Sequence, residues 1–229
     1  MSEKLHWTPG YRIIRTIYPP VDLFEDIADP ADWELLVSAE AKLNPRIRDE
    51  VGNLALVPAA RRIGGPTASI AMGSFTHVSA DRASRFTDGS YGVWYCGDRF
   101  EVALAETAYH FQRFMRATAE PLSDADFRVL TCPVTAKVVV APETCLTETD
   151  WLPGQAFGLQ ARSEGQDGVL YRSVRYPAGQ AAAIFWPDCL TLPITQNQQL
   201  RYRWNGNRMS HFLAHGATEW TPWPIDGVA

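Results

Sequence analysis

The chain has 229 residues, of which 46% are hydrophobic and 21% are charged, and its formal net charge at pH 7 is -5. This balance is typical of a folded globular protein and excludes an intrinsically disordered chain. The negative charge argues against a general nucleic-acid-binding protein, because such a protein needs an excess of Lys and Arg to release counterions from phosphates.

The cysteines and the first residues indicate a cellular compartment. Four cysteines lie far apart and form no CxxC or Cys/His metal pattern: Cys96, Cys132, Cys145 and Cys189. We therefore expect buried free thiols in a reducing compartment, and no metal site. Residues 1–7 lack the apolar core of a signal peptide, and no segment approaches the roughly 18 apolar residues of a membrane span. The sequence thus predicts a cytoplasmic protein without a membrane segment.

The first predicted elements are a strand and a helix. A strand is predicted over residues 11–18, closed by two prolines. Asp29 and Pro30 are typical of the N-cap and the first position of a helix. Asn44 and Pro45 are expected to end that helix, because a residue before proline disfavours helical geometry.

A stretch rich in Gly, Pro and Ser leads to the clearest helix of the chain. Two short strands are predicted first, over residues 71–78 and 92–96. Asp98 and Glu101 then form an Asp-x-x-Glu capping pair, followed by apolar residues at helical spacing as far as Met115. We expect a long amphipathic helix here, with Asp98 as its cap.

The second half of the chain is predicted to be mostly strands. The expected elements are strands over 127–130 and 137–140, a helix over 155–163 that stops at Gly165, strands over 169–174 and 181–186, and a hairpin of 200–204 and 208–212 around Asn205-Gly206-Asn207.

Strands outnumber helices and do not alternate with them, which favours an α+β fold with a mixed β-sheet core and flanking helices. No Gly-x-Gly-x-x-Gly or Walker loop is present, so we expect neither a Rossmann nor a P-loop site. We expect a single domain over 1–229. Residues 1–43 would form an extension packed on it, 44–190 the part that bears the motifs, and 191–229 a hairpin and tail.

Three segments carry polar residues where a packed element would prefer apolar ones: 84–95, 103–110 and 168–175. The residues at issue are Arg85 with Phe86 and Gly89, Tyr95, Glu106 with His110, Ser173, Arg175, Gly179 and Phe185. This ordered set resembles the RES domain, a family named after an Arg, a Glu and a Ser in that order. The resemblance implies a fold related to ADP-ribosyltransferases and a bacterial toxin that attacks NAD and is blocked by a helix-turn-helix antitoxin.

The N-terminal region refines this resemblance. Residues 44–46 and 75–77 are similar to those of ParT-type members, which transfer ADP-ribose to the host ribose-phosphate pyrophosphokinase. The chain departs from the family where Phe86 and Thr87 replace Trp-Asn, and where Gln180 replaces an Asn. These departures leave the substrate details open.

The resemblance assigns roles that elementary chemistry supports. Cleavage of NAD at the nicotinamide–ribose bond builds positive charge on the ribose, which a carboxylate, Glu106, would oppose. The planar guanidinium of Arg85 suits a diphosphate. Tyr95 would stack on the nicotinamide ring, and Ser173 would orient the ribose end or steady the carboxylate. We expect His77 and Arg46 to line the same cleft.

Each of these residues also has a purely structural interpretation. Glu106 is equally well explained as a solvated helix carboxylate, and Arg85 as an exposed loop residue. Tyr95 is explained as a core residue, and Ser173 as a strand residue whose hydroxyl is satisfied locally. His110 lies four residues after Glu106 on the same helix face, but no third metal ligand is apparent, so a packing histidine is favoured.

Three functions remain open on the sequence. The first is a toxin that transfers ADP-ribose from NAD to a host protein such as ribose-phosphate pyrophosphokinase. The second uses the same site for hydrolysis or phosphorolysis of NAD, and the third is a non-catalytic binding module. The resemblance further implies a helix-turn-helix antitoxin of the Xre or ParS type and a homodimer within the complex, with any DNA contact made by the antitoxin.

Overall fold

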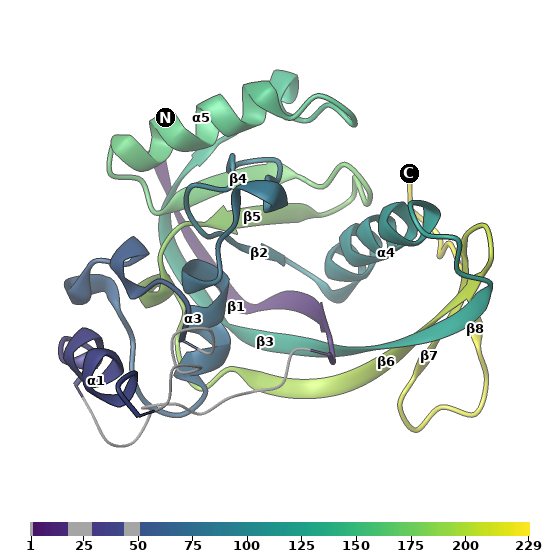
Figure 1. The fold of residues 1–229 in the computed structure, drawn as a ribbon. Helices are drawn as coiled ribbons and strands as arrows, with labels where there is room; N and C mark the ends of the chain where they lie inside the picture. The colour runs from purple at the N-terminus through teal and green to yellow at the C-terminus, as the bar shows by residue number, and fades with distance from the viewer. Residues whose placement is uncertain (1, 18–28, 44–50) are drawn as a thin grey trace.

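The computed structural model describes residues 2–17, 29–43 and 51–229, and in these ranges eight strands form one sheet (Figure 1). The strands are β1 (Ser2–Arg15), β2 (Trp94–Gly97), β3 (Leu122–Val140), β4 (Gly168–Arg172), β5 (Gln180–Ile184), β6 (Thr195–Asn205), β7 (Met209–Ala214) and β8 (Thr221–Pro222). The α-helices are α1 (Trp33–Glu40), α3 (Ala68–Thr76), α4 (Phe100–Arg116) and α5 (Leu152–Ser163). Short 3-10 turns connect them: Leu54–Leu56, Ala59–Arg61, Ala80–Arg82, Glu143–Cys145 and Pro187–Cys189.

The strand order is β1-β2-β5-β4-β3-β6-β7-β8, and β1 also pairs with β3. The five strands β1, β2, β5, β4 and β3 therefore close on themselves, while β6, β7 and β8 extend from β3. Most pairs are antiparallel, but β3 and β4 run parallel. This mixed sheet with flanking helices confirms the predicted α+β fold.

Both faces of the sheet are covered, which explains the continuous apolar runs in the sequence. On β5, Ala182 and Ile184 point into a core shared with α3, while Ala181 and Ala183 point into a second core shared with α5. Alternate residues of a strand face opposite sides of the sheet, so both sets are buried. Figure 1 shows α3 and α5 on different sides of the strands.

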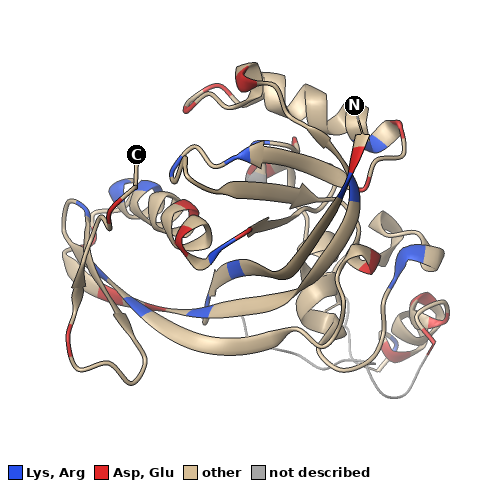
Figure 2. Cartoon of the chain, turned by 180° about the vertical axis from the view of Figure 1, so that it is seen from behind, with Lys and Arg blue, Asp and Glu red and all other residues tan. Residues whose placement is uncertain are grey.

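Helix α4 packs against β1, β3, β6 and β7 through a third core. Leu104 and Phe111 of the helix meet the stacked rings of Phe127 and Tyr202, whose centroids lie 4.1 Å apart. The helix carries Glu101 in its first turn and arginines in its last, so red and blue lie at its opposite ends in Figure 2. This distribution complements the helix dipole.

The long helix is confirmed, but its predicted cap is wrong. The N-cap position is Arg99, and no side chain caps the helix. The carboxylate of Asp98 instead accepts hydrogen bonds from the Arg99 guanidinium at 3.2 and 3.0 Å. The backbone N–H of Asp98 bonds to Gln180, so this residue belongs to the strand end rather than to the helix.

The prediction of a strand over 71–78 is also wrong, because these residues lie mostly in α3. The segment contains the strand-favouring residues Phe75, Thr76 and Val78. However, Ala68, Ala71, Met72 and Phe75 are all buried, and their spacing of three to four residues is that of one helix face.

The helix predicted from Asp29 begins later than expected, at Trp33. The Asp29 carboxylate accepts from the Ala31 N–H at 2.8 Å, and its carbonyl accepts from Asp32, so it closes a turn ahead of the helix. The predicted stop at Asn44 and Pro45 lies outside the described residues.

The remaining elements were placed with smaller errors. The predicted strand 11–18 is the end of β1, which begins at Ser2 and stops at Arg15, and the strands 127–130 and 137–140 are parts of the single strand β3. The strands at 92–96, 169–174 and 181–186 correspond to β2, β4 and β5. Helix α5 begins three residues earlier than predicted.

The predicted turns and thiols are confirmed. Gly165 ends α5 with a positive φ of 74°, and Gly206 turns the predicted β6–β7 hairpin with a φ of 93°. All four cysteines are free and buried. Within the described ranges, no helix is long and apolar enough to cross a membrane.

Candidate active site

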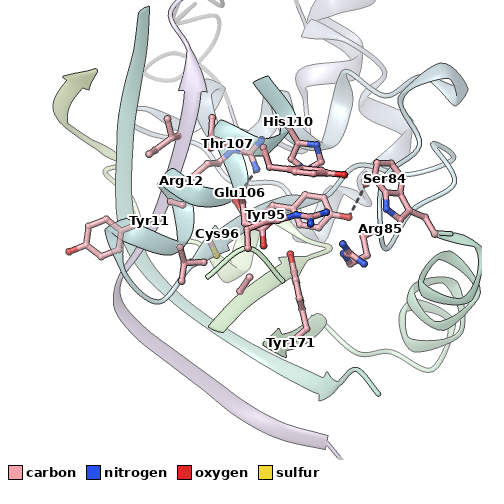
Figure 3. Close-up of a pocket in the computed structure, with 18 residues that line it drawn as sticks. Tyr11, Arg12, Ser84, Arg85, Tyr95, Cys96, Glu106, Thr107, His110 and Tyr171 are labelled. Carbon is pink, nitrogen blue, oxygen red and sulfur yellow. Dashed lines mark hydrogen bonds between the residues drawn. The ribbon is translucent and has the colours of Figure 1, made fainter. Parts of the chain in front are cut away.

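A cavity of about 260 Å³ lies between α4, β2, the loop at residues 84–85 and the start of α5 (Figure 3). Its charged lining consists of the guanidiniums of Arg12, Arg85 and Arg175 and the single carboxylate of Glu106. Aromatic residues supply much of the remaining wall: Tyr11, Tyr95, Tyr109, Trp151 and Tyr171. The cavity is therefore locally positive in a chain whose net charge is -5, which favours an anionic ligand.

The carboxylate of Glu106 is held from behind by Ser173. The helix α4 presents Glu106 to the cavity, next to the buried residues Val102 and Ala105. Ser173, which is fully buried in the turn after β4, donates from Oγ to Glu106 Oε1 at 2.8 Å. The same Oγ accepts the N–H of Tyr176 at 3.0 Å, so its own hydrogen is directed to the carboxylate.

The side chain of Arg85 is held by backbone carbonyl oxygens, and the loop that carries Arg85 is held by Tyr95. Its Nη1 donates to the carbonyls of Cys145 and Thr147, at 3.2 and 2.7 Å. The neighbouring Tyr95 hydroxyl accepts the N–H of Phe86 at 3.0 Å and bonds to Ser84 Oγ at 2.8 Å (Figure 3). Tyr95 therefore anchors the loop that carries Arg85.

The backbone of helix α5 packs closely against the backbone of the loop that carries Arg85. A Cβ atom on Gly154 would collide with the carbonyl oxygen of Arg85, and one on Gly158 with that of Phe86. Gln155, between these glycines, donates from Nε2 to the carbonyl of Ser84 at 3.1 Å. One face of α5 is thus shaped to receive the arginine loop.

Two further arginines reach the cavity, and sequence reasoning assigned a role to neither. Arg12 on β1 donates to the carbonyl of Tyr95 at 3.1 Å, and burial lowers its pKa to about 10. Arg175 is only 5% exposed, and its guanidinium lies 3.5 Å from the ring centre of Tyr109. The available signals were a charged residue inside the predicted strand 11–18, for Arg12, and a place directly after Ser173 in the RES-like residue set, for Arg175.

His110 and Tyr171 line the same cavity in uncharged form. Desolvation of the ring, with the nearby charges of Arg175, Arg113 and Arg85, lowers the pKa of His110 below its ordinary value of 6.5, although part of the residue faces solvent. Burial raises the pKa of the Tyr171 hydroxyl well above 10, and the negative charge of Glu106 acts in the same direction. Both groups are therefore neutral near pH 7.

The structure brings together four of the six residues predicted for the site. Arg85, Tyr95 and Glu106 line one cavity, and Ser173 contacts it through Glu106. His77 does not belong with them: it follows α3 and lines a second hollow with Asn53 and Thr76. Arg46 lies outside the described residues. Among the described residues, no group of three or more His, Cys, Asp and Glu side chains is arranged to hold a metal ion.

Most residues that line this cavity lie in a segment that matches a known domain family. The RES domain profile matches residues 59–205, which include Arg85, Tyr95, Glu106 and Ser173. The chain belongs to the RES domain family. This places it in a family of toxins that process NAD, as the sequence resemblance predicts. Most of the cavity wall belongs to the RES domain. Arg12 comes instead from β1, which precedes the matched region.

One relative of this RES domain protein is similar over more of the chain than the domain itself. The uncharacterized protein y4oC of Sinorhizobium fredii is 31% identical over 210 residues, which cover 89% of this chain and 86% of the relative. Among solved structures, a chain of the M. tuberculosis MbcT–MbcA toxin–antitoxin complex is similar with a TM-score of 0.43 and 13% identity, over 86% of this chain and 85% of that chain.

Proposed function

We propose that this RES domain protein is a toxin that breaks the nicotinamide–ribose bond of NAD and transfers the ADP-ribose to a host protein. The observation that carries the proposal is the Glu106 carboxylate, which Ser173 orients at 2.8 Å in a cavity whose other charged lining groups are all guanidiniums. A lone oriented carboxylate among cations fits a ligand that is anionic at one end and becomes cationic at the reacting carbon.

Glu106 would act on the ribose. When the bond to nicotinamide breaks, its electron pair leaves with the ring as neutral nicotinamide, and positive charge grows on the ribose carbon. The carboxylate opposes this charge and accepts a hydrogen bond from a ribose hydroxyl. Ser173 contributes as a positioning residue, because its hydrogen bond holds the carboxylate in one orientation before the substrate arrives.

Arg85 and Tyr95 would bind the rest of the substrate. The fork of guanidinium donors on Arg85 matches the oxygen atoms of a diphosphate, which a chain lacking a glycine-rich phosphate loop must bind by side chains. The ring of Tyr95 lines the cavity, and an aromatic wall there suits the flat nicotinamide. Its hydroxyl is already committed to the arginine loop, so Tyr95 serves both purposes.

The proposal also includes three protein partners. By similarity to ParT-type members, we infer that the acceptor is a host protein such as ribose-phosphate pyrophosphokinase. We also infer that the chain acts as a homodimer and is held inactive by a helix-turn-helix antitoxin. The abundance of arginine around the cavity suits an acidic or polar segment of that antitoxin.

The test is product analysis with labelled NAD. Purified protein is incubated with NAD labelled in the adenylate part, with and without bacterial lysate, with and without phosphate, and nicotinamide release is measured in each mixture. We expect nicotinamide release together with label on a protein band. Release without protein labelling would instead identify hydrolysis or, if dependent on phosphate, phosphorolysis. No release from folded protein would refute NAD consumption.

A further inference from the structure

We propose that Arg175 is a second anion-binding residue of this site, and that the carboxylate of Glu148 occupies it until a phosphate group of the ligand takes its place. The inference rests on the proposed function in one respect, namely that the ligand is a dinucleotide with a diphosphate. The site is therefore regulated by an acidic side chain of its own chain that competes with the substrate.

The buried guanidinium of Arg175 has hydrogen-bond donors that are not used in the described chain. It lies in the turn between β4 and β5, two residues after Ser173, and it is 5% exposed. Its Nε and Nη2 atoms are shielded from solvent and have no hydrogen-bond partner within the described ranges. Buried donors of a charged group are rarely left unpaired, because their lost hydration is not replaced.

The arginine is held in place independently of any anion. The ring of Tyr109 lies 3.5 Å from the centre of the guanidinium, and the backbone carbonyl of Arg175 accepts the N–H of Ala229 at 3.0 Å. These contacts fix the position of the group and leave its donor edge as the part that can exchange partners. A fixed cation loses little conformational entropy when an anion binds to it.

The one ion-pair partner of Arg175 in the described chain is poorly held. Nη1 donates to Glu148 Oε1, but the Glu148 side chain is 69% exposed, whereas that of Arg175 is 6% exposed. Because the glutamate has water as an alternative partner and the arginine has none, the pair can open by movement of Glu148 alone. The strong partner for a buried guanidinium would be an oxyanion that engages several donors at once.

The loop that carries Glu148 also serves Arg85. Its neighbour Thr147 accepts from Arg85 Nη1 at 2.7 Å, and Trp151, at the end of the same loop, lines the cavity. Residues 147–151 therefore offer oxygen acceptors to two cavity arginines that come from segments 90 residues apart. A diphosphate carries enough acceptor oxygens to replace both, and both arginines line the same cavity.

Direct binding measurements test the inference without requiring catalysis. Calorimetric titration with ADP-ribose, and separately with inorganic pyrophosphate, distinguishes a dinucleotide diphosphate from any small phosphate. The variants are Glu148→Gln and Arg175→Gln. The exposed ion pair of Glu143 with Arg172, whose charged atoms are 3.1 Å apart, supplies the matched controls Glu143→Gln and Arg172→Gln, because neither residue lines the cavity.

We expect Glu148→Gln to bind ADP-ribose about two- to five-fold more tightly than the parent, because it removes a partly exposed competitor. Arg175→Gln should weaken binding by roughly tenfold or more, since a buried charged donor is lost. The two control variants should bind within the error of the parent. Glu148 is exposed, so its substitution leaves the fold intact. Arg175→Lys, which keeps the charge, should recover part of the affinity lost in Arg175→Gln.

Equal effects of Glu148→Gln and Glu143→Gln would overturn the inference, as would unchanged binding by Arg175→Gln or no binding of ADP-ribose to the parent. The inference would also be overturned if the variants changed the affinity for pyrophosphate as predicted but left the affinity for ADP-ribose unchanged. That result would indicate a site for small phosphates. Failure of the proposed function looks different: binding shifts as predicted, but the parent releases no nicotinamide from NAD.

Discussion

Ser173 Oγ and Glu106 Oε1 are 2.8 Å apart, and this hydrogen bond joins the turn after β4 to the middle of α4. The two residues are 67 positions apart in the chain. Replacing Ser173 with Ala removes the donor and leaves the N–H of Tyr176 without its acceptor. We expect the kcat of nicotinamide release to fall about 10- to 100-fold, as for loss of a hydrogen bond to a charged group, with a smaller change in KM.

The control for that variant is Ser163→Ala, because the hydrogen bond that Ser163 Oγ makes in the described part of the chain goes to a backbone carbonyl at the exposed end of α5. Its kcat should equal that of the parent. Thermal unfolding of both variants separates a positioning effect from a loss of fold. If Ser173→Ala retained the full kcat, Ser173 would be a structural residue and nothing more.

Tyr95→Phe tests whether the tyrosine hydroxyl holds the arginine loop. The variant keeps the ring but removes the acceptor for the Phe86 N–H and the partner of Ser84. We expect KM for NAD to rise several-fold, and the free energy of unfolding to fall by about 1–2 kcal/mol. Tyr11→Phe is the matched control, since Tyr11 lines the same cavity without a hydrogen bond from its hydroxyl in the described chain. Equal KM values for the two variants would contradict this role.

Gly158→Ala tests the close approach of α5 to the arginine loop. The added methyl group would collide with the carbonyl oxygen of Phe86, so either the loop or the helix must move. We expect a loss of about 1–3 kcal/mol in unfolding free energy and weaker binding of ADP-ribose. Gly73→Ala in α3 is the control, because its new Cβ would meet no atom nearer than 3.7 Å. A fully stable Gly158→Ala protein with parental affinity would show that the contact is unimportant.

The pKa of His110 should report on the occupancy of the arginine cluster. Desolvation and the charges of Arg175, Arg113 and Arg85 lower this pKa below 6.5 in the folded protein. The folded state therefore takes up a proton less readily than the unfolded chain, and this group reduces stability as pH falls below 6.5. A bound diphosphate neutralises the arginines, so it should raise the pKa of His110, and by linkage ADP-ribose should bind more tightly at pH 5.5 than at pH 7.5.

Proton NMR titration of the His110 ring, with and without ADP-ribose, measures this directly. His110→Asn identifies the resonance and should remove the corresponding part of the pH dependence of binding. A ring pKa at or above 6.5 in the free protein, or one that ligand leaves unchanged, would contradict the arrangement of charges around the cavity.

The sequence predicted the fold class and the order of most elements, because buried strands and the amphipathic α4 leave clear periodic patterns. It failed at α3, where Ala71, Met72 and Phe75 lie among residues with weak helix preference, and at Asp98, whose partner is the adjacent Arg99 rather than the helix N-terminus. Such local choices are decided by tertiary contacts that no short window contains.

The site was predictable only where residues stand in a recognisable order. Arg85, Tyr95, Glu106 and Ser173 follow one another as in the RES domain, and the structure brings them to one place. Arg175 stands in the same ordered set but received no role from it, and Arg12 lies outside the set altogether. Their positions depend on the closure of β1 onto β2 and β3, and on the loop around Glu148, which are properties of the folded chain.

The central claim is that Glu106 carries the cleavage of NAD, and nicotinamide release by Glu106→Gln tests it most directly. The matched variant is Glu101→Gln, in the first turn of the same helix. We predict that Glu106→Gln lowers kcat by about 100-fold or more at an unchanged melting temperature, while Glu101→Gln behaves as the parent. Full activity of a folded Glu106→Gln protein would contradict the account.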